Sequence, residues 1–295
     1  MEWYQFVYDT FFQFGEHLRA LVAHYLHVID VAHFLLMCMS VRDEYGLPFS
    51  RNNPLACWFS SLLCSFSGTF LTNFLLGDSL TSPLCNHSDM ILFTSIWFSI
   101  FYLPFDVVYR LCRVFPIKLI LSLIKEIQRT HKINLGVESA VRRYPDEDMV
   151  QVIVGYTKGA GSGVLRSVQQ WLSGGWKPMD NESLKMSTTT KATLIASLLF
   201  YLNPPLHTNI SYTAYRILSY PSHLPFQISA ILLVACKAFS LLNLSKNPFS
   251  SVEYVLCALV IGREEEVART VVEKIGEEKR EERSTNGIKR RKRRS

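Results

Sequence analysis

The chain has 295 residues, of which 48% are hydrophobic and 19% charged, with a formal net charge of +6. Apolar stretches of about 20 residues, the length that crosses a bilayer, recur along it and are separated by short polar loops. These features exclude a single soluble domain as the expected fold and predict an all-α integral membrane protein.

Seven candidate spans follow a segment at 1–16 that is predicted to be lumenal. The spans are predicted at 17–41, 54–77, 89–110, 116–141, 148–172, 189–206 and 223–243. The fourth and fifth contain charges and glycines, which lower their hydropathy, so a five-span chain without them is the alternative. A charged tail occupies 244–295.

Polar residues lie inside several spans. Asp30 and His33 are three residues apart in the first span and are therefore neighbours on one helix face, and Asp106 stands at the end of the third span. Pairing with a cation or a backbone group is the expected role of these residues, and direct ion coordination is the alternative. Lys237 in the seventh span is expected to be paired or to reach toward the cytosol.

The fourth span carries a cationic stripe along one helix face. At about 100° per residue, its polar positions fall within about 40° of one line along the helix. The stripe consists of Lys118, Ser122, Lys125, Arg129 and Lys132. Such a helix spans the membrane if the stripe faces water, an acidic partner or a lipid headgroup. The alternative is an amphipathic helix lying on the cytosolic surface.

The fifth span contains the glycine-rich stretch "GYTKGAGSG" at 155–163. Because each glycine weakens a helix by about 1 kcal/mol relative to alanine, we predict a break or hinge here. Close helix packing through small residues, without a break, is the alternative. A nucleotide-binding loop is disfavoured, because the order G-x-x-x-x-G-K-[ST] is missing.

The spans fall into two groups of three, at 17–110 and 116–206. Successive groups of three necessarily have opposite orientation in a membrane. The second span has Gly68 at mid-depth, where the fifth has its glycines, and paired interruptions of this kind indicate an inverted repeat with a functional pathway between the halves. The seventh span, 223–243, lies outside the repeat.

The loops on the two sides differ in positive charge. One side has Arg42, Arg51, Arg110, Arg113, Lys118, Lys177, Lys185 and Lys191, and the other has Arg142, Arg143 and Arg216. The positive-inside rule places the first set in the cytosol, the N-terminus in the lumen and the C-terminus in the cytosol. The tail reads as a solvated extension, with attraction to anionic lipid or an arginine-based retention signal as alternatives.

Residues that carry enzyme or metal chemistry form no recognisable motif. The seven cysteines are odd in number and show no C-x-x-C spacing, and the patterns H-E-x-x-H and G-x-S-x-G are missing. We therefore expect no catalytic residue, no metal site and no catalytic cofactor. The basic end of the tail is weak evidence for a nuclear signal in a chain with seven spans, and we expect no nucleic-acid partner.

Four stretches resemble one known family, the trimeric intracellular cation channels, and most closely its B-type animal members. They are "WFSIFYLPFDVVYR", "FPIKLILSLIKEIQR", "GYTKGAGSG" and "GGWKPMDNESLKMSTTTKATL", and the resemblance covers about residues 25–261. It implies a homotrimer of seven-span protomers, each with its own pore. It also implies potassium conduction in the endoplasmic or sarcoplasmic reticulum, as counter-ion current coupled to calcium-release channels.

The resemblance further implies roles for individual residues. Lys125 and Arg129 are expected to bind the headgroup of a phosphatidylinositol bisphosphate beside the pore. We add Lys118, Gly159, Ala160, Gly161 and Ser162 to this lipid site. The pore and its gating are assigned to Lys158, Gly163, Ser122, Lys132, Gly68 and Asp30. Spans one, two, four and five are expected to line the pore.

The stripe alone would repel potassium, since two unit charges about 4 Å apart interact by about 4 kcal/mol at an effective dielectric near 20. A bound anionic headgroup would cancel that field. Two alternatives to a channel remain at this point. One is a secondary transporter for an anionic solute, with the stripe as its substrate site, and the other is a non-conducting membrane adaptor that acts through its basic tail.

Overall fold

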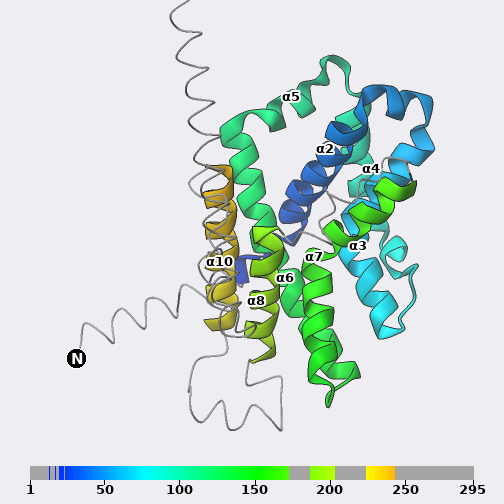
Figure 1. Ribbon diagram of the computed structural model, residues 1–295. Helices are drawn as coiled ribbons and strands as arrows, with labels where there is room; N and C mark the ends of the chain where they lie inside the picture. Colours follow the sequence, from blue (N-terminus) through cyan, green and yellow to red (C-terminus); the bar gives the residue numbers. More distant parts are fainter. Residues whose placement is uncertain are drawn as a thin grey trace, which may run out of the picture. The chain divides into compact units, whose positions relative to one another are not determined.

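The computed structural model describes residues 13, 17, 20–22, 24–172, 187–202 and 224–242. Within these residues every regular element is a helix, as Figure 1 shows. The predicted all-α class is therefore confirmed for the described part of the chain. Residue 13 alone is described within the predicted lumenal segment 1–16, and the predicted tail at 244–295 lies outside the described residues.

The long helices follow the predicted spans closely in the middle of the chain. The first three are α2 (Leu26–Asn52), α3 (Pro54–Leu76) and α4 (His87–Tyr102). The next are the short α5 (Val107–Arg113), then α6 (Phe115–Arg143), α7 (Asp148–Leu172), α8 (Thr188–Tyr201) and α10 (Leu224–Leu241). Short 3-10 turns, η1 (Ser82–Cys85) and η2 (Pro104–Asp106), stand before α4 and α5.

Local sequence explains where several of these helices begin and end. Pro54 stands in the first turn of α3, where its missing N–H is not needed, and α3 ends at Gly77, whose backbone is left-handed with φ 73°. The side chain of Ser187 caps α8 by accepting a hydrogen bond from the Thr190 backbone N–H. These signals act between neighbouring residues, so the amino-acid sequence alone contains them.

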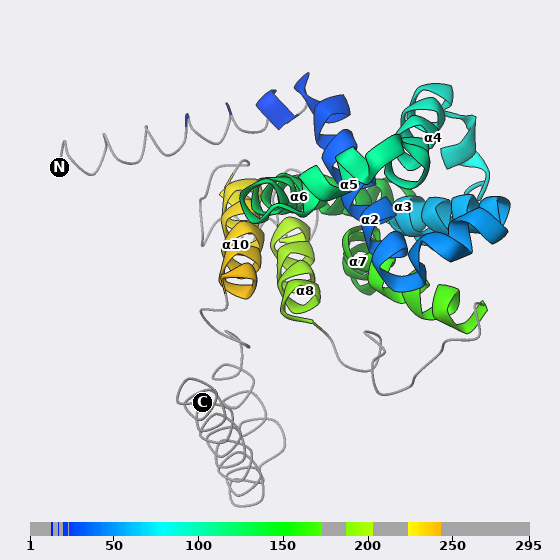
Figure 2. The ribbon, with the colours of Figure 1, turned by 90° about the horizontal axis from the view of Figure 1, so that it is seen from above.

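The helices pack as two groups of three plus α10. In the first group α2, α3 and α4 pack against one another, and in the second α6, α7 and α8 do the same. The groups meet through α3 against α7 and α2 against α6, while α10 lies against α6 and α8, as the view in Figure 2 shows. Phe34, Phe66 and Phe93 join the three helices of the first group, with ring centroids 5.4 to 5.9 Å apart.

The helix that contains the first predicted span extends beyond residue 41, where the predicted span ends. Helix α2 continues to Asn52, with a kink at Gly46, where φ is 74°. The prediction stopped where hydropathy falls, at Arg42, but that side chain is only 5% exposed. A charged residue that is paired inside the bundle does not end a helix.

The third span is not one straight helix. Helix α4 and the segment Pro104–Arg113 meet at a bend of 97°. Phe105 and Asp106 have left-handed backbone conformations there, with φ of 62° and 55°. Pro104 has no backbone N–H with which to continue α4. A hydropathy profile contains no information about the direction of a helix, so the bend was not predicted.

Arg42 of α2 holds this bend in place. Its guanidinium lies 2.9 Å from the carboxylate of Asp106, donates to the carbonyl of Ile100 and stacks over the ring of Tyr109 at 3.9 Å from the centroid. The expected structural pairing of Asp106 with a cation is therefore confirmed. The pairing joins α2 to both arms of the bend.

Changing Asp106 to Asn is expected to destabilise the protein by about 2 kcal/mol, because the buried guanidinium of Arg42 loses a charged partner. Asn tolerates the left-handed backbone as Asp does, so conformational strain stays the same. Thermal unfolding of the purified protein in detergent measures the effect. Asp146→Asn, at an exposed position, is the matched control, and equal melting of both variants would contradict the role of the pair.

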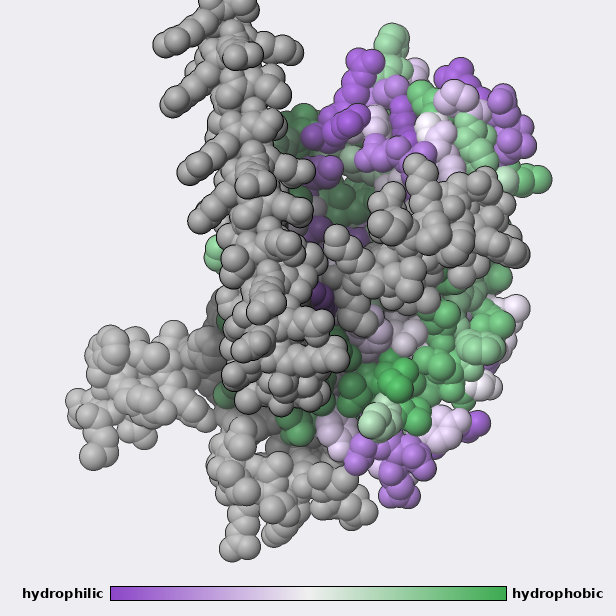
Figure 3. All heavy atoms as spheres, in the orientation of Figure 1, coloured by the Kyte–Doolittle hydropathy of each residue, from purple (hydrophilic) through white to green (hydrophobic). Residues whose placement is uncertain are grey.

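Hydropathy supports a membrane protein but not the full span count. The helices α3 and α10 are long and apolar enough to cross a membrane, and α4 with Pro104–Arg113 adds a third if the bent pair is one span. On the face shown in Figure 3, hydrophobic residues form a band between hydrophilic residues at both ends. The count of seven spans stays a prediction.

Candidate functional site

The cationic stripe of the fourth span lies inside the helix bundle. Helix α6 is continuous from Phe115 to Arg143 and packs against α2, α7, α8 and α10. Its polar positions line two cavities between these helices. This arrangement favours a buried helix over the alternative of an amphipathic helix lying on the membrane surface.

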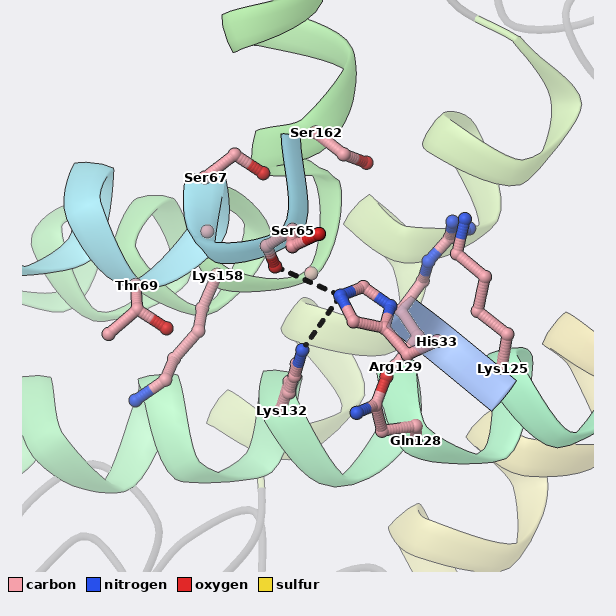
Figure 4. Close-up of a pocket in the computed structure, with 12 residues that line it drawn as sticks. His33, Ser65, Ser67, Thr69, Lys125, Gln128, Arg129, Lys132, Lys158 and Ser162 are labelled. Carbon is pink, nitrogen blue, oxygen red and sulfur yellow. Dashed lines mark hydrogen bonds between the residues drawn. The ribbon is translucent and has the colours of Figure 1, made fainter. Parts of the chain in front are cut away.

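The smaller cavity, shown in Figure 4, lies between α2, α3, α6 and α7 and measures about 20 Å³. It is lined by His33, Ser65, Ser67, Gly68, Thr69, Lys125, Gln128, Arg129, Lys132, Lys158, Gly159 and Ser162. A volume of this size holds about one water molecule. The cavity is therefore a polar constriction with four cations around it.

The larger cavity lies between α2, α6 and α10 and measures about 440 Å³. It is lined by Leu36, Met37, Met39, Ser40, Asp43, Glu44, Lys118, Ser122, Lys125, Lys237 and Leu241. Lys125 lines both cavities. The stripe is thus divided, with its first half in the wide cavity and its second half in the narrow one.

Arg129 is paired within its own helix. Its Nη1 lies 2.9 Å from Oε2 of Glu126, which is 1% exposed. That oxygen has no hydrogen-bond partner within the described residues, so its interaction with Arg129 is an attraction between charges. The sequence interpretation missed Glu126, although the i, i+3 spacing of an acid and a base on one helix was the available signal.

His33 connects the first two helices at the narrow cavity. Its Nε2 lies 2.9 Å from the carbonyl oxygen of Ser65 and 3.4 Å from the ammonium of Lys132, and Figure 4 marks both contacts. The shorter contact is the better hydrogen bond, so Nε2 donates to Ser65 and Lys132 lies beside it. Figure 4 also shows Lys125 and Arg129 on one side of His33 and Lys158 on the other.

Asp30 accepts a hydrogen bond from Gln128 of α6. This partner is a side-chain amide and not the cation or backbone group that was expected, and Gln128 is a second residue that the sequence interpretation missed. Asp30 also gathers with His27 and Asp89, whose ligand atoms all lie within 4.8 Å of one another. Exposed acidic groups are common in proteins without a metal ion, so this cluster is not evidence for a metal site.

The predicted break or hinge in the fifth span is present as a change of direction and not as an interruption of the helix (Figure 1). The backbone of α7 stays helical from Asp148 to Leu172, although Figures 1 and 2 show its later part running in a different direction from its start. Close packing through small residues is present as well. A Cβ on Gly68 would lie 2.3 Å from the carbonyl oxygen of Lys158, and one on Gly161 would lie 2.6 Å from the Cα of Gly68.

The structure brings most of the predicted site residues together. Around the narrow cavity lie Lys125, Arg129, Lys132, Lys158, Gly68, Gly159 and Ser162, and around the wide one lie Lys118, Ser122 and again Lys125. Ala160 is buried and Gly161 packs on Gly68, so these two hold helices together and line neither cavity. Gly163 lines neither cavity. The ligands assigned to these residues stay predictions.

Comparison with known proteins finds one family. The TRIC channel family matches residues 44–244. Trimeric intracellular cation channel type 1B.2 of Caenorhabditis elegans is 42% identical over 258 residues, covering 86% of this chain and 79% of that protein.

Two solved structures are similar in fold. A trimeric intracellular cation channel from C. elegans, in the absence of Ca²⁺, has a TM-score of 0.70 at 42% identity, covering 80% of this chain and 97% of that one. A structure that addresses the activity of TRIC counter-ion channels in calcium release has a TM-score of 0.65 at 34% identity, covering 74% and 93%.

Proposed function

Because this chain belongs to the family of trimeric intracellular cation channels, we propose that it conducts potassium through a pathway inside each protomer of a homotrimer. The current would balance charge during calcium release from the endoplasmic or sarcoplasmic reticulum, as the relative described for calcium release suggests. A channel family also fits the prediction that the chain is not an enzyme.

The observation that carries this proposal is the polar interior of the bundle. Lys125 lines both the wide cavity and the narrow cavity, and both cavities are bordered by α2 and α6. Intramembrane charges of this kind are costly unless they serve a pathway or a bound ligand. The four helices α2, α3, α6 and α7 meet around the narrow cavity, as proposed for the pore.

The packing supports an arrangement of two inverted groups of three spans plus a seventh. Contacts between the groups join equivalent helices, since α2 meets α6 and α3 meets α7. Figure 1 places the α2–α3 junction and α5 at one end of the bundle and the α6–α7 connection at the other. With the positive-inside rule, the first end is cytosolic, the N-terminus lumenal and the C-terminus cytosolic.

A phosphoinositide beside the pore is the second part of the proposal. The stripe places Lys125, Arg129 and Lys132 within the same cavity as Lys158, and uncompensated cations there would oppose potassium entry. A phosphatidylinositol bisphosphate headgroup supplies several negative charges and accepts charge-assisted hydrogen bonds from Lys and Arg. The lipid therefore makes a cationic stripe compatible with cation conduction.

Purified protein in planar bilayers under a potassium gradient tests the conduction. We expect unitary current steps that reverse near the potassium equilibrium potential. Saturable exchange of an anion, with no unitary current, would instead support the transporter that the cationic stripe also suggests. Omitting protein from the bilayer is the control for leak.

A further inference from the structure

Helix α5 (Val107–Arg113) turns away from the direction of α4. The chain bends by 97° between α4 and the segment Pro104–Arg113, so α5 runs roughly parallel to the membrane plane when α4 crosses it. The 16 residues of α4 span about 24 Å, slightly less than a hydrocarbon core of about 30 Å. Figure 1 shows α5 at one end of the bundle. A helix in this position lies near the boundary between acyl chains and headgroups.

One side of α5 packs against the protein. Cys112 is buried, and Val108 is partly buried, in the apolar core that α2, α3 and α4 share. Tyr109 stacks against the guanidinium of Arg42 and donates a hydrogen bond to the carboxylate of Asp43, and both partners belong to α2. These contacts fix the rotation of α5 about its own axis and therefore determine which of its residues face outward.

The outward side of α5 is apolar. Val107 and Leu111, which are one helical turn apart, are both exposed, and Val114 is exposed where the helix ends. Phe105, at the bend before α5, is 85% exposed, and Phe115 after it is exposed as well. We call these five residues the α5 strip. Large exposed apolar side chains gathered in one short segment are typical of a surface that contacts a membrane or another protein.

A basic edge runs beside the α5 strip. At about 100° per residue, Arg110 and Arg113 lie about 100° and 160° from Leu111, in the same direction around the helix. Both arginines are exposed. The acid in this segment, Asp106, is paired with Arg42 and does not balance them. An apolar face flanked by exposed cations is the pattern of a helix that lies in the membrane interface, where its cations meet anionic headgroups.

We propose that α5 is an interfacial helix that anchors the protein to the anionic surface of the bilayer. The α5 strip embeds among the acyl chains nearest the headgroups, and Arg110 and Arg113 contact lipid phosphates. A second protomer is the weaker candidate for this surface, because cations at a protein interface need acidic partners. The inference uses the proposed cytosolic orientation of this end, since the cytosolic leaflet carries the negative surface potential. It needs neither the proposed conduction nor the proposed phosphoinositide.

Nitroxide spin labels on introduced cysteines test the placement of the strip in lipid nanodiscs. A label at Leu111→Cys is expected to be several-fold more accessible to oxygen than to a water-soluble nickel chelate, because oxygen concentrates among acyl chains. Val107→Cys should agree, and Arg110→Cys on the basic edge should show the opposite order. The variants are made with Cys85→Ser, which removes an exposed native thiol. This background without an added cysteine measures residual labelling.

Comparing nanodiscs of phosphatidylcholine alone with nanodiscs that also contain phosphatidylserine tests the basic edge. Phosphatidylserine is expected to raise the ratio of oxygen to nickel accessibility at Leu111→Cys, and adding Arg110→Gln should remove about half of that increase, since one of two cations is lost. Arg142→Gln, exposed at the other end of α6, is the matched control and should leave the increase unchanged.

Three outcomes would overturn the inference. Nickel accessibility above oxygen accessibility at Leu111→Cys would place the strip in water. Low accessibility to both reagents, with dipolar broadening between labels, would place it between protomers. A ratio that is the same in both kinds of nanodisc would refute the role of the basic edge. None of these measurements uses current, so a failure of the proposed conduction stays distinguishable from a failure of this inference.

Discussion

Gly68→Ala is expected to destabilise the protein by about 3 kcal/mol and to abolish its current. The new Cβ would stand 2.3 Å from the carbonyl oxygen of Lys158 and 3.1 Å from its carbonyl carbon. Because both atoms belong to the backbone of α7, no side-chain rotation relieves the overlap, and α3 and α7 must separate. Such a shift moves Lys158 and Gly159, which line the narrow cavity.

The direction of the stability change in Gly68→Ala distinguishes close packing from its absence. Alanine stabilises a helix by about 1 kcal/mol relative to glycine, so a glycine-to-alanine substitution without a packing conflict would raise the stability of the protein. Gly161→Ala should act like Gly68→Ala, since its Cβ would lie 2.6 Å from the Cα of Gly68. Gly136→Ala, with a nearest contact of 3.0 Å, should cost less. Thermal unfolding in detergent ranks the three variants, and stabilisation by Gly68→Ala would refute the close contact.

Arg129→Ala is expected to destabilise the protein by about 3 to 5 kcal/mol, because it leaves the carboxylate of Glu126 buried without its ion partner. Glu126 is 1% exposed, and Arg129 is the cation 2.9 Å from it. Loss of lipid retention in this variant alone would therefore not separate binding from folding. Thermal unfolding and lipid retention must be measured on the same preparation.

The double variant Glu126→Gln with Arg129→Ala separates the two effects. Removing both charges should restore most of the stability, since the glutamine carries no charge to be paired. If Arg129 also binds the phosphoinositide, the double variant stays deficient in lipid retention although it is folded. If retention returns together with stability, the role of Arg129 is confined to pairing with Glu126. Lys125→Ala, which keeps the ion pair of Arg129 with Glu126, is the companion variant for binding.

The regular helices in the middle of the chain were predictable because their signals are local. The ranges predicted at 54–77 and 148–172 correspond to α3 (Pro54–Leu76) and α7 (Asp148–Leu172). Proline at the start of a helix and glycine at its end act through neighbouring backbone, so the sequence contains them directly. The cationic stripe of α6 is equally local, because it follows from helix periodicity.

Two features of the structure depend on contacts between distant segments, which hydropathy and glycine content do not contain. The prediction ended the first span near Arg42, whose charge is balanced by Asp106, a residue far along the chain. It also predicted a break or hinge at the glycines of the fifth span, where the helix changes direction without an interruption (Figure 1). In the structure Gly161 admits the backbone of α3 at Gly68, whereas Gly155 and Gly159 lie against residues of α6 and α8, and this packing compensates for their low helix propensity.

The sequence by itself determined the helical class, the stripe of α6 and the motifs that identify the family. Only the tertiary structure decided which cation faces which cavity: Arg129 is balanced by Glu126, whereas Lys125 stands between the narrow and wide cavities and meets Lys237 in the wide one. Periodicity gives the direction of a side chain around its own helix. Its neighbours depend on how distant helices pack, and no local pattern contains that information.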